Sequence, residues 1–361
     1  MSTLKVNAIR GTGASSDAIS VNSTDGTCTA KITNNLSNRN LIINGSMQCA
    51  QYGTTDTSTG YYTTVDRWNF TANGQEENLT RAQESLSSSD TGPYELGFRN
   101  AWKITNGNQT GGADAGGYVI PQYAIEAQDL ANSGWNYKSA SSYITLSFWV
   151  KSSVAQTFYG FLRTLDGTGQ AYSFNYALSA NTWTKVTKTI PGNSNIQIDN
   201  DNGSGMSIFF PTFLGTDRTN SGNVEETWAA YSGSNRTKDF TTTWYTTNDA
   251  TWHLTGVQLE VGDTATDFEH RLYGDELAKC QRYYWQSENM YFYACNYSSA
   301  HAMCHIFHPT TMRTTPTEDM TTSQSFTHYK ESPRVFIAYV SKAYDSGGSA
   351  FFSQAKFSAE L

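Results

Sequence analysis

The sequence predicts an all-β chain with an N-terminal arm, a central β-sandwich, a short connecting helix and a small β-rich tip. Aromatic residues make up 14% and charged residues 16% of the 361 positions, while Thr, Ser, Asn and Gly abound. That mixture is typical of strands joined by many turns. Apolar and polar residues alternate in segment after segment, as in half-buried strands. The regular succession of strands and helices that builds a doubly wound fold does not occur.

Residues 1–40 form the predicted arm. The patches "LKVNAI", "AISV" and "CTAKI" are short and are separated by Gly, Ser, Thr and Asp. None can bury enough apolar surface to fold alone. Because the patches keep a strand-like alternation, we expect an arm that pairs with copies of itself or with a larger assembly. A disordered leader is the alternative.

Residues 41–272 form the predicted sandwich. Two segments, "YELGFRNAWKI" and "YITLSFWV", alternate so that one face of each is apolar. These faces carry Leu96, Phe98, Trp102 and Ile104 in the first segment, and Ile144, Leu146, Phe148 and Val150 in the second. Further strands are predicted at "TFYGFLRTL", "TWTKVTKTI", "GMSIFFPTFLG" and "TWHLTGVQLEV". Strands repeated with turn signals over this length indicate two packed antiparallel sheets.

Residues 257–285, "VQLEVGDTATDFEHRLYGDELAKCQRYYW", end the sandwich and start the connecting helix. Val257, Leu259 and Val261 alternate as in a strand, and Gly262 begins a turn. From Tyr273 the apolar spacing becomes helical, which predicts a helix over 273–286 with Gly274 and Asp275 at its cap. The many charges of this stretch are interpreted as solvated loop and helix-face groups rather than catalysts.

Residues 287–361 form the predicted tip, with strands at "MYFYACNY", "AHAMCHIF" and "RVFIAYV". One face of the first strand carries tyrosines, and one face of the second carries histidines. The candidate ligand-binding residues are therefore Tyr291, Tyr293, Tyr297, His301 and His305. Tyrosine offers a flat apolar surface with a polar handle, which suits sugars or a protein epitope. An interface between copies of the chain is the alternative for the tyrosines, and wet surface is the alternative for the histidines.

Several functional classes are disfavoured. A net charge of −8 argues against nucleic-acid binding, and the lack of an 18-residue apolar run argues against membrane insertion. The N-terminus lacks the apolar region of a signal peptide, so synthesis in a cytoplasm is expected. No G-x-S-x-G, P-loop, H-E-x-x-H or G-x-G-x-x-G motif follows the required elements, so no enzyme, catalytic residue or cofactor is predicted.

The five cysteines are scattered, and we expect them to be free thiols. Cys295, His301, Cys304, His305 and His308 are metal-ligand residue types, yet adjacent residues of a strand point to opposite faces, so no metal site is predicted there. The loop "IDNDNGSGM" lacks the spacing of an EF-hand and is interpreted as a turn.

The ordered segments "NLIINGSMQCAQYGTT", "YYTTVDRW", "SFWVKSS", "GVQLEVGDTATDFEHRLYGDELAKCQRYYW" and "FHPTTMRTTPT" resemble tail-fibre and receptor-binding proteins of tailed phages and prophages. The resemblance covers about residues 40–317. The start, "MSTLKVNAI", is similar to the N-termini of tail fibres of marine cyanophages.

The resemblance implies a jelly-roll sandwich, tail attachment and trimerisation through residues 1–40, and a receptor-binding tip. It further implies a homotrimer in the virion tail, synthesised in the host cytoplasm, that contacts other phage tail proteins. Its ligand would be a bacterial surface polysaccharide or lipopolysaccharide, bound without catalysis. Multivalent display would raise avidity for weak sugar sites.

For residues 257–285 the resemblance implies closure of the sandwich and connection to the tip. Val257, Leu259 and Val261 would finish the sheet, and Phe268 would plug the edge of the core. Arg271 or Arg282 would pair with Asp267 or Glu276 to hold the helix against the sandwich.

Two alternatives stay open. The chain could be a structural tail connector that holds another receptor-binding protein, because fold does not fix function. It could also be a glycan depolymerase, for which the available carboxylates are Asp66, Glu95, Asp263, Asp267 and Glu269. The long repeats of a β-helix, common in such enzymes, are not seen as a sequence period.

Overall fold

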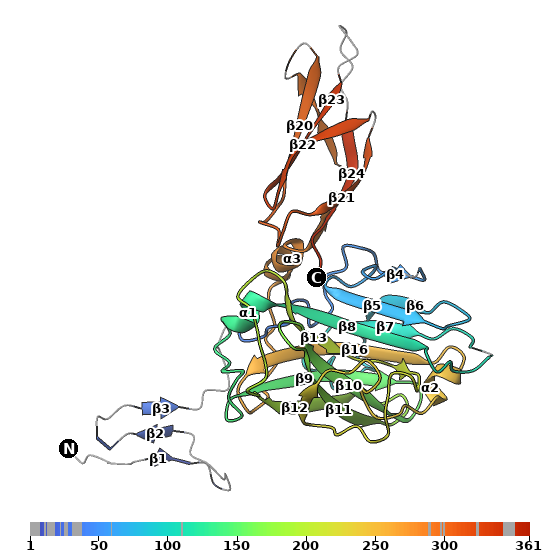
Figure 1. Cartoon of the computed structure of the whole chain (residues 1–361), viewed down its shortest axis with the longest axis vertical. Coiled ribbons are helices and arrows are strands. Elements are labelled where there is room, and N and C mark those ends of the chain that lie inside the picture. Colours follow the sequence, from blue (N-terminus) through green and yellow to red (C-terminus); the bar gives the residue numbers. More distant parts are fainter. Residues whose placement is uncertain are drawn as a thin grey trace.

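The computed structural model describes residues 8–10, 12, 19–21, 23–24, 28–30, 38–58, 60–109, 111–287, 290–296, 298, 300–322, 325–341 and 351–361. Figure 1 shows three parts: a small sheet that stands to one side, a broad sandwich, and a narrow upright part reached through a helix. Strands dominate every part, so the predicted all-β fold class is confirmed. Among the described residues, no helix combines the length and the hydropathy needed to cross a membrane.

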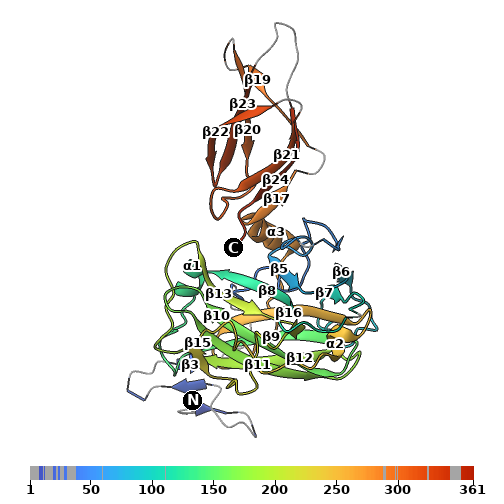
Figure 2. The same cartoon turned by 45° about the vertical axis from the view of Figure 1, so that its right-hand side comes forward.

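The N-terminal sheet consists of β1 (Ala8–Ile9), β2 (Ile19–Val21) and β3 (Cys28–Ala30), paired antiparallel in sequence order. These strands fall within the three apolar patches of the sequence. The sheet stands to one side of the sandwich in Figure 1 and beneath it in Figure 2, and Ile9 is 53% exposed. Such short strands gain little stability alone.

Two antiparallel sheets form the sandwich. One sheet contains β5 (Trp68–Asn73), β8 (Tyr118–Glu126), β10 (Gln156–Thr164), β11 (Gln170–Leu178), β13 (Ser204–Phe209), β14 (Phe213–Leu214) and β15 (Trp228–Ala230). The other contains β4 (Thr55–Asp56), β6 (Thr80–Ser85), β7 (Asn100–Thr105), β9 (Tyr143–Ser152), β12 (Thr184–Pro191) and β16 (Thr251–Val261). Short helices α1 (Ala127–Ala131) and α2 (Thr243–Thr246) lie in the connections. Because β7, β8, β9 and β10 alternate between the two sheets, the connectivity is that of a jelly roll.

The core between the sheets follows the predicted alternation along β9. Ile144, Leu146, Phe148 and Val150 are all fully buried. The segment before β7 differs from the expectation, because the strand begins at Asn100 and Leu96 is 52% exposed. Residues 86–99 instead fold as a loop. In its turn the Leu96 N–H donates to the carbonyl oxygens of Gly92 and Pro93, which prevents this segment from continuing as a strand.

The upright part, called the tip below, comprises β17 (Tyr284–Gln286), β18 (Tyr291–Tyr293), β19 (Cys295–Asn296), β20 (His301–Phe307), β21 (Thr317–Thr322), β22 (Phe326–Ser332), β23 (Val335–Ser341) and β24 (Phe351–Ser358). β24 pairs with β17, β18 and β21, while β20 and β23 lie between β19 and β22. The two sheets face each other (Figure 2) and share a core of their own. β24 leads the chain back toward the sandwich.

The connecting helix α3 (Tyr273–Gln281) is shorter than the predicted span of 273–286, and Leu272 rather than Gly274 or Asp275 is its N-cap. Tyr284 and Trp285 pair with Ser358 and Phe357 of β24. The Trp285 ring stacks on that of Phe357 at 5.0 Å between centroids. Aromatic pairing across strands therefore ends the helix before residue 284.

Candidate functional site

The predicted tyrosine face of the tip is partly described. Tyr291 and Tyr293 are each 59% exposed on β18, while Phe292 between them packs on the tip core. Tyr297 lies outside the described residues. The alternation therefore places the first two tyrosines on the outer surface of the sheet that contains β24. Their role as ligand-binding residues stays a prediction.

The predicted histidine face lies on β20, in the other sheet of the tip. His305 is exposed and His301 is half-buried, with its ring edge-on to Tyr339 at 4.8 Å. Cys304 is buried in the tip core, so it points away from His305 as the strand geometry requires. The tyrosines and histidines thus occupy different sheets and do not form one cluster.

The closing strand β16 carries the predicted core residues. Val257 and Leu259 are fully buried, whereas Val261, the last residue of the strand, is 40% exposed. A bulge interrupts the pairing of β16 with β9 at Gly256, where φ is +61°. There the stretch before Gly45 docks along β16, and Val257 N–H donates to the carbonyl of Gly45 at 2.9 Å. A Cβ at Gly45 would lie 2.1 Å from the Val257 oxygen, so this approach requires glycine.

Phe268 does not enter the main core. It is half-buried against Phe98 at 4.8 Å between ring centroids, edge to face. Leu86, Trp149 and Trp183 belong to the same satellite cluster. Phe148 faces the main core, and successive side chains of a strand point to opposite faces, so its neighbour Trp149 points outward. The cluster therefore lies on the outer face of the sheet.

The two arginines attach the connector at different points. Arg271 lies 3.4 Å from Glu276 and donates to the carbonyl oxygen of Asn40 at 2.5 Å. Of the predicted alternatives, the structure shows the pair of Arg271 with Glu276, whereas Arg282 pairs with Glu126 of β8 at 2.6 Å. Glu126 is fully buried and also accepts from the Tyr283 hydroxyl at 2.7 Å. Glu276 is already paired with Arg271, and Asp267 is exposed to solvent, whereas Glu126 is buried beside Arg282.

A groove opens between the sandwich and the tip, with a cavity volume of about 400 Å³. We call it the junction groove. Its lining includes Tyr52, Asp56, Tyr62, Tyr284, Asp319 and Lys356. The first three come from the segment before β5 and from β4, and the others from tip strands β17, β21 and β24. The groove therefore exists only because the tip is docked on the sandwich.

Stacked tyrosine rings line this groove. Tyr52 lies 3.6 Å from Tyr284 and 6.4 Å from Tyr62 between ring centroids, with interplanar angles of 16° and 22°. Burial raises the pKa of Tyr62 to about 12 and also raises the pKa of Tyr52, so both hydroxyls are neutral at physiological pH. The Tyr62 hydroxyl donates to the Leu361 carbonyl at 2.8 Å and the Tyr52 hydroxyl to Glu360 at 3.3 Å, so the groove offers the partly exposed rings of these two tyrosines.

Carboxylates border the tyrosines. Burial opposes ionisation of Asp56, but hydrogen bonds from Ser58 and Thr63 and the charge of Arg81 outweigh it and lower its pKa. Asp319 is exposed at the rim and lies 3.4 Å from the ammonium group of Lys356. The groove therefore presents both acceptors and a cation beside flat apolar surface.

A buried ion pair underlies the groove. Arg67, 1% exposed, pairs with Glu360. Its guanidinium lies 3.5 Å from the centroid of the Tyr283 ring. Although burial disfavours its charge, Glu360 outweighs this and raises the pKa of Arg67. The Tyr52 hydroxyl donates to Glu360 at 3.3 Å, so the ion pair also holds the Tyr52 ring in its position in the groove.

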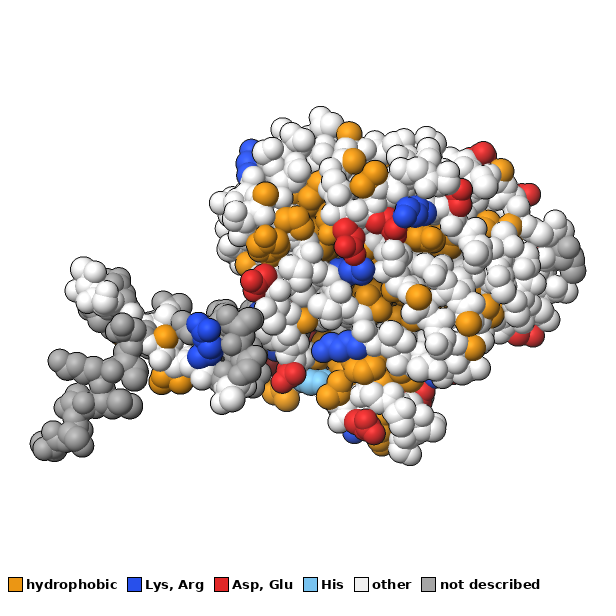
Figure 3. Space-filling model, turned by 90° about the horizontal axis from the view of Figure 1, so that it is seen from below, with side chains coloured by type: hydrophobic (Ala, Val, Ile, Leu, Met, Phe, Trp, Pro, Cys, Tyr) orange, Lys and Arg blue, Asp and Glu red, His pale blue; other side chains and the backbone are white. Residues whose placement is uncertain are grey.

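The carboxylates considered for a depolymerase do not converge. Asp66 is buried under the groove, Glu95 is exposed on the loop before β7, and Asp263 and Asp267 are exposed after β16. Glu269 accepts from the backbone N–H of Asn40 at 2.8 Å, a structural role. On the face of the sandwich seen in Figure 3, Lys and Arg side chains lie apart, and several adjoin Asp or Glu, so they form no basic patch on that face.

No protein-family model matches this sequence, and no curated protein matches it. Solved structures with a similar fold include the enzymatically active domain of tailspike protein 4 of bacteriophage CBA120, at 14% identity over 62% of this chain, with a TM-score of 0.32. The match spans only 22% of that tailspike chain. A carbohydrate-binding module of family 4 is 12% identical over 61% of this chain and 98% of its own, with a TM-score of 0.32. The N-terminal cellulose-binding domain of Cellulomonas fimi β-1,4-glucanase C is 14% identical over 60% and 99%, with a TM-score of 0.27.

Proposed function

We propose that this chain is a non-enzymatic virion tail-fibre protein that attaches to a bacterial surface by binding glycan in the junction groove. The observation that carries the proposal is the groove itself, where stacked Tyr52, Tyr62 and Tyr284 adjoin the carboxylates of Asp56 and Asp319. Sugar rings have apolar faces that pack on aromatic rings and hydroxyl groups that require hydrogen-bond partners. The groove supplies both kinds of contact.

Rigidity of the groove supports the same role. The Arg67–Glu360 pair, the Glu126–Arg282 pair and the bond from Arg313 to the carbonyl of Asn202 join the sandwich to the tip. A binding site that is held in place before the ligand arrives loses less conformational entropy on binding. Because the tip is docked on the sandwich, the groove is in place before a sugar arrives. This preorganisation helps a site whose individual contacts with the sugar are weak.

The proposal includes a homotrimer in the virion tail, made in the host cytoplasm and attached to tail proteins through residues 1–40. The short strands β1, β2 and β3, which stand apart from the sandwich, support a partner for this segment. The trimer and the tail attachment rest on the sequence resemblance. Three copies would bring three weak sites onto one polysaccharide and raise avidity.

Glycan cleavage is the second candidate, because Asp56, Glu318 and Asp319 are all among the residues that line the groove. Paired carboxylates are the groups that glycosidases use. Release of reducing ends from the bound polysaccharide would show cleavage, and their absence after prolonged incubation would support binding alone.

The first experiment measures the mass of the purified full chain in solution and its retention on intact host cells. We expect a mass of three chains and saturable binding. A trimer that ignores cells would instead favour a tail connector, and a monomer that ignores cells would contradict the proposal.

A further inference from the structure

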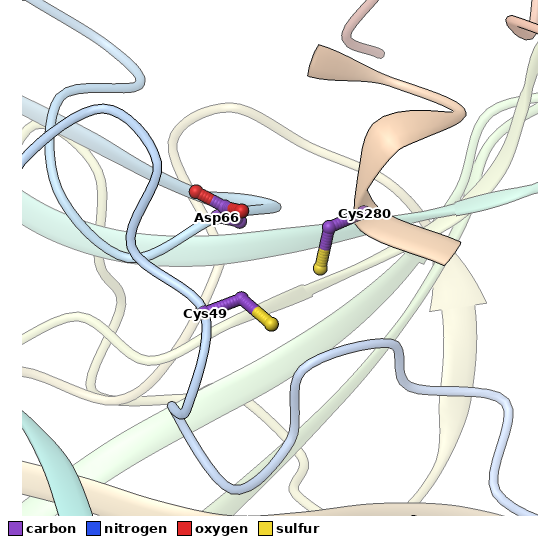
Figure 4. Close-up of side chains that lie close together, drawn as sticks. All are labelled: Cys49, Asp66 and Cys280. Atoms are coloured by element: carbon purple, nitrogen blue, oxygen red, sulfur yellow. The ribbon is translucent and has the colours of Figure 1, made fainter. Parts of the chain in front are cut away.

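Two thiols and a carboxylate converge at the root of the tip. Figure 4 shows the thiols of Cys49, on a loop, and Cys280, on α3, turned toward each other, with the carboxylate of Asp66, from the segment before β5, above them. Their ligand atoms all lie within 4.8 Å of one another. All three residues are at most 1% exposed. Three potential ligands that are far apart in sequence thus meet in the interior.

Hydrogen bonds fix the two sandwich residues of this cluster. Asn44, with φ at +59°, donates from Nδ2 to the carbonyls of Cys49 and Asp66 at 2.8 and 2.9 Å, and accepts from Cys49 N–H at 3.0 Å. Gln51 donates from its backbone N–H and its Nε2 to the two oxygens of Asp66, each at 2.7 Å. The backbone N–H of Tyr52 also donates to this carboxylate, and the four lone-pair sites of its two oxygens leave one for a metal ion. Outer contacts of this kind orient the ligands of metal sites.

The third residue is fixed through its helix. Glu276, one turn before Cys280 in α3, accepts from the backbone N–H of Asn44 and lies 3.4 Å from Arg271. One asparagine therefore links all three segments that carry the thiols and the carboxylate. The cluster is held as a unit rather than formed by flexible side chains.

We propose that Cys49, Asp66 and Cys280 bind one zinc ion that joins the sandwich to α3. Thiolate ligands select zinc over calcium or magnesium, and zinc accepts carboxylate oxygen beside sulfur. With Zn–S bonds of about 2.3 Å, the two sulfurs of a tetrahedral site lie about 3.8 Å apart. Because the ligand atoms lie within 4.8 Å of one another, only a small inward movement is needed.

Binding involves no oxidation. Each thiol forms a bond from sulfur to the ion and releases its proton to solvent. A water would fill the fourth position. Since the cluster is closed to solvent, the ion enters as the chain folds and then exchanges slowly. This site is independent of the glycan-binding proposal, because the junction groove needs no metal.

The test is the metal content of the full chain, refolded with Zn²⁺ and freed of excess ion, measured by mass spectrometry under native conditions. We expect about one zinc per chain, and less than about a tenth of that in Cys280→Ser and in Cys49→Ser. The matched control is Cys304→Ser, which changes a buried cysteine of the tip core and should retain the ion. Refolding with Co²⁺ should give a thiolate-to-cobalt absorption band in the wild type and in the control alone.

Either of two results would overturn the proposal. One is a wild-type chain that folds in the presence of Zn²⁺ or Co²⁺ and carries neither ion. The other is a disulfide between Cys49 and Cys280, found as a linked peptide pair in a non-reduced digest of the wild type and lost on reduction. Both results are read from the wild type, so they hold even if a cysteine variant fails to fold.

Discussion

Replacing Glu360 with alanine should loosen the tip, because it leaves the charge of Arg67 buried without its partner. The side chains of Arg67 and Glu360 are 1% and 5% exposed. Removing one member of a buried pair commonly costs about 3–5 kcal/mol. Arg67 keeps its bond to the Ala124 carbonyl at 2.8 Å and its place over the Tyr283 ring. We therefore expect a loss near the lower end, about 3 kcal/mol.

Urea unfolding of the full chain measures this loss, followed by tryptophan fluorescence. The control is Lys356→Ala, which breaks an ion pair with Asp319 at 3.4 Å whose side chains are 47% and 79% exposed. Exposed pairs contribute about 0–1 kcal/mol, so the control should be nearly neutral. Combining Arg67→Met with Glu360→Leu should recover much of the loss, because neither charge remains buried. If Glu360→Ala costs no more than Lys356→Ala, the pair does not hold the tip.

Phe268→Ala should destabilise the chain by about 2–3 kcal/mol by removing the packing on Phe98, and an unchanged melting temperature would contradict that packing. Gly256→Ala should lower the melting temperature, because φ is +61° and the added Cβ lies 2.7 Å from the Phe98 ring. Gly233→Ala, with open space around it, should not lower it. Burial lowers the pKa of His308 to about 4 from the ordinary 6.5, so the folded chain binds fewer protons than the unfolded chain between these values. The contribution of His308 to stability should therefore fall as the pH is lowered from 6.5 toward 4. Because burial raises the pKa of Asp66 to about 7 and so acts in the opposite direction, the contribution is measured as the difference in unfolding midpoint between the wild type and His308→Gln. A difference that does not change with pH would contradict the shift.

Strand alternation predicted much of the sandwich from the sequence. It placed Phe148 and Leu259 in the core, because a period of two leaves one choice of buried face. It was wrong at Leu96, where turn bonds override an apolar pattern. The predicted helix was also wrong at Tyr284, which lies in a strand paired with β24. The spacing of apolar residues there fits a helix as well as a strand, and only the partner strand decides between them.

The junction groove could not be predicted from local patterns. Arg67 and Glu360 are 293 positions apart, and the chain meets itself there only because β24 returns to the sandwich. Tyr52 was part of a recognised segment, but nothing in its neighbours indicates the stack with Tyr284. Contacts of such separation depend on the tertiary fold rather than on periodicity.

The measurement that tests the central claim most directly is binding of the full chain to a panel of purified bacterial polysaccharides, compared between two variants. Asp319→Ala combined with Lys356→Ala alters the exposed rim of the junction groove, whereas Tyr291→Ala combined with Tyr293→Ala alters the outer face of the tip. We predict that the wild type binds at least one polysaccharide and that the groove variant loses about tenfold or more in affinity, equivalent to about 1.4 kcal/mol. The tip variant should bind as the wild type does. Full binding by the groove variant, with loss in the tip variant, would contradict the account and move the site to the tyrosines of β18.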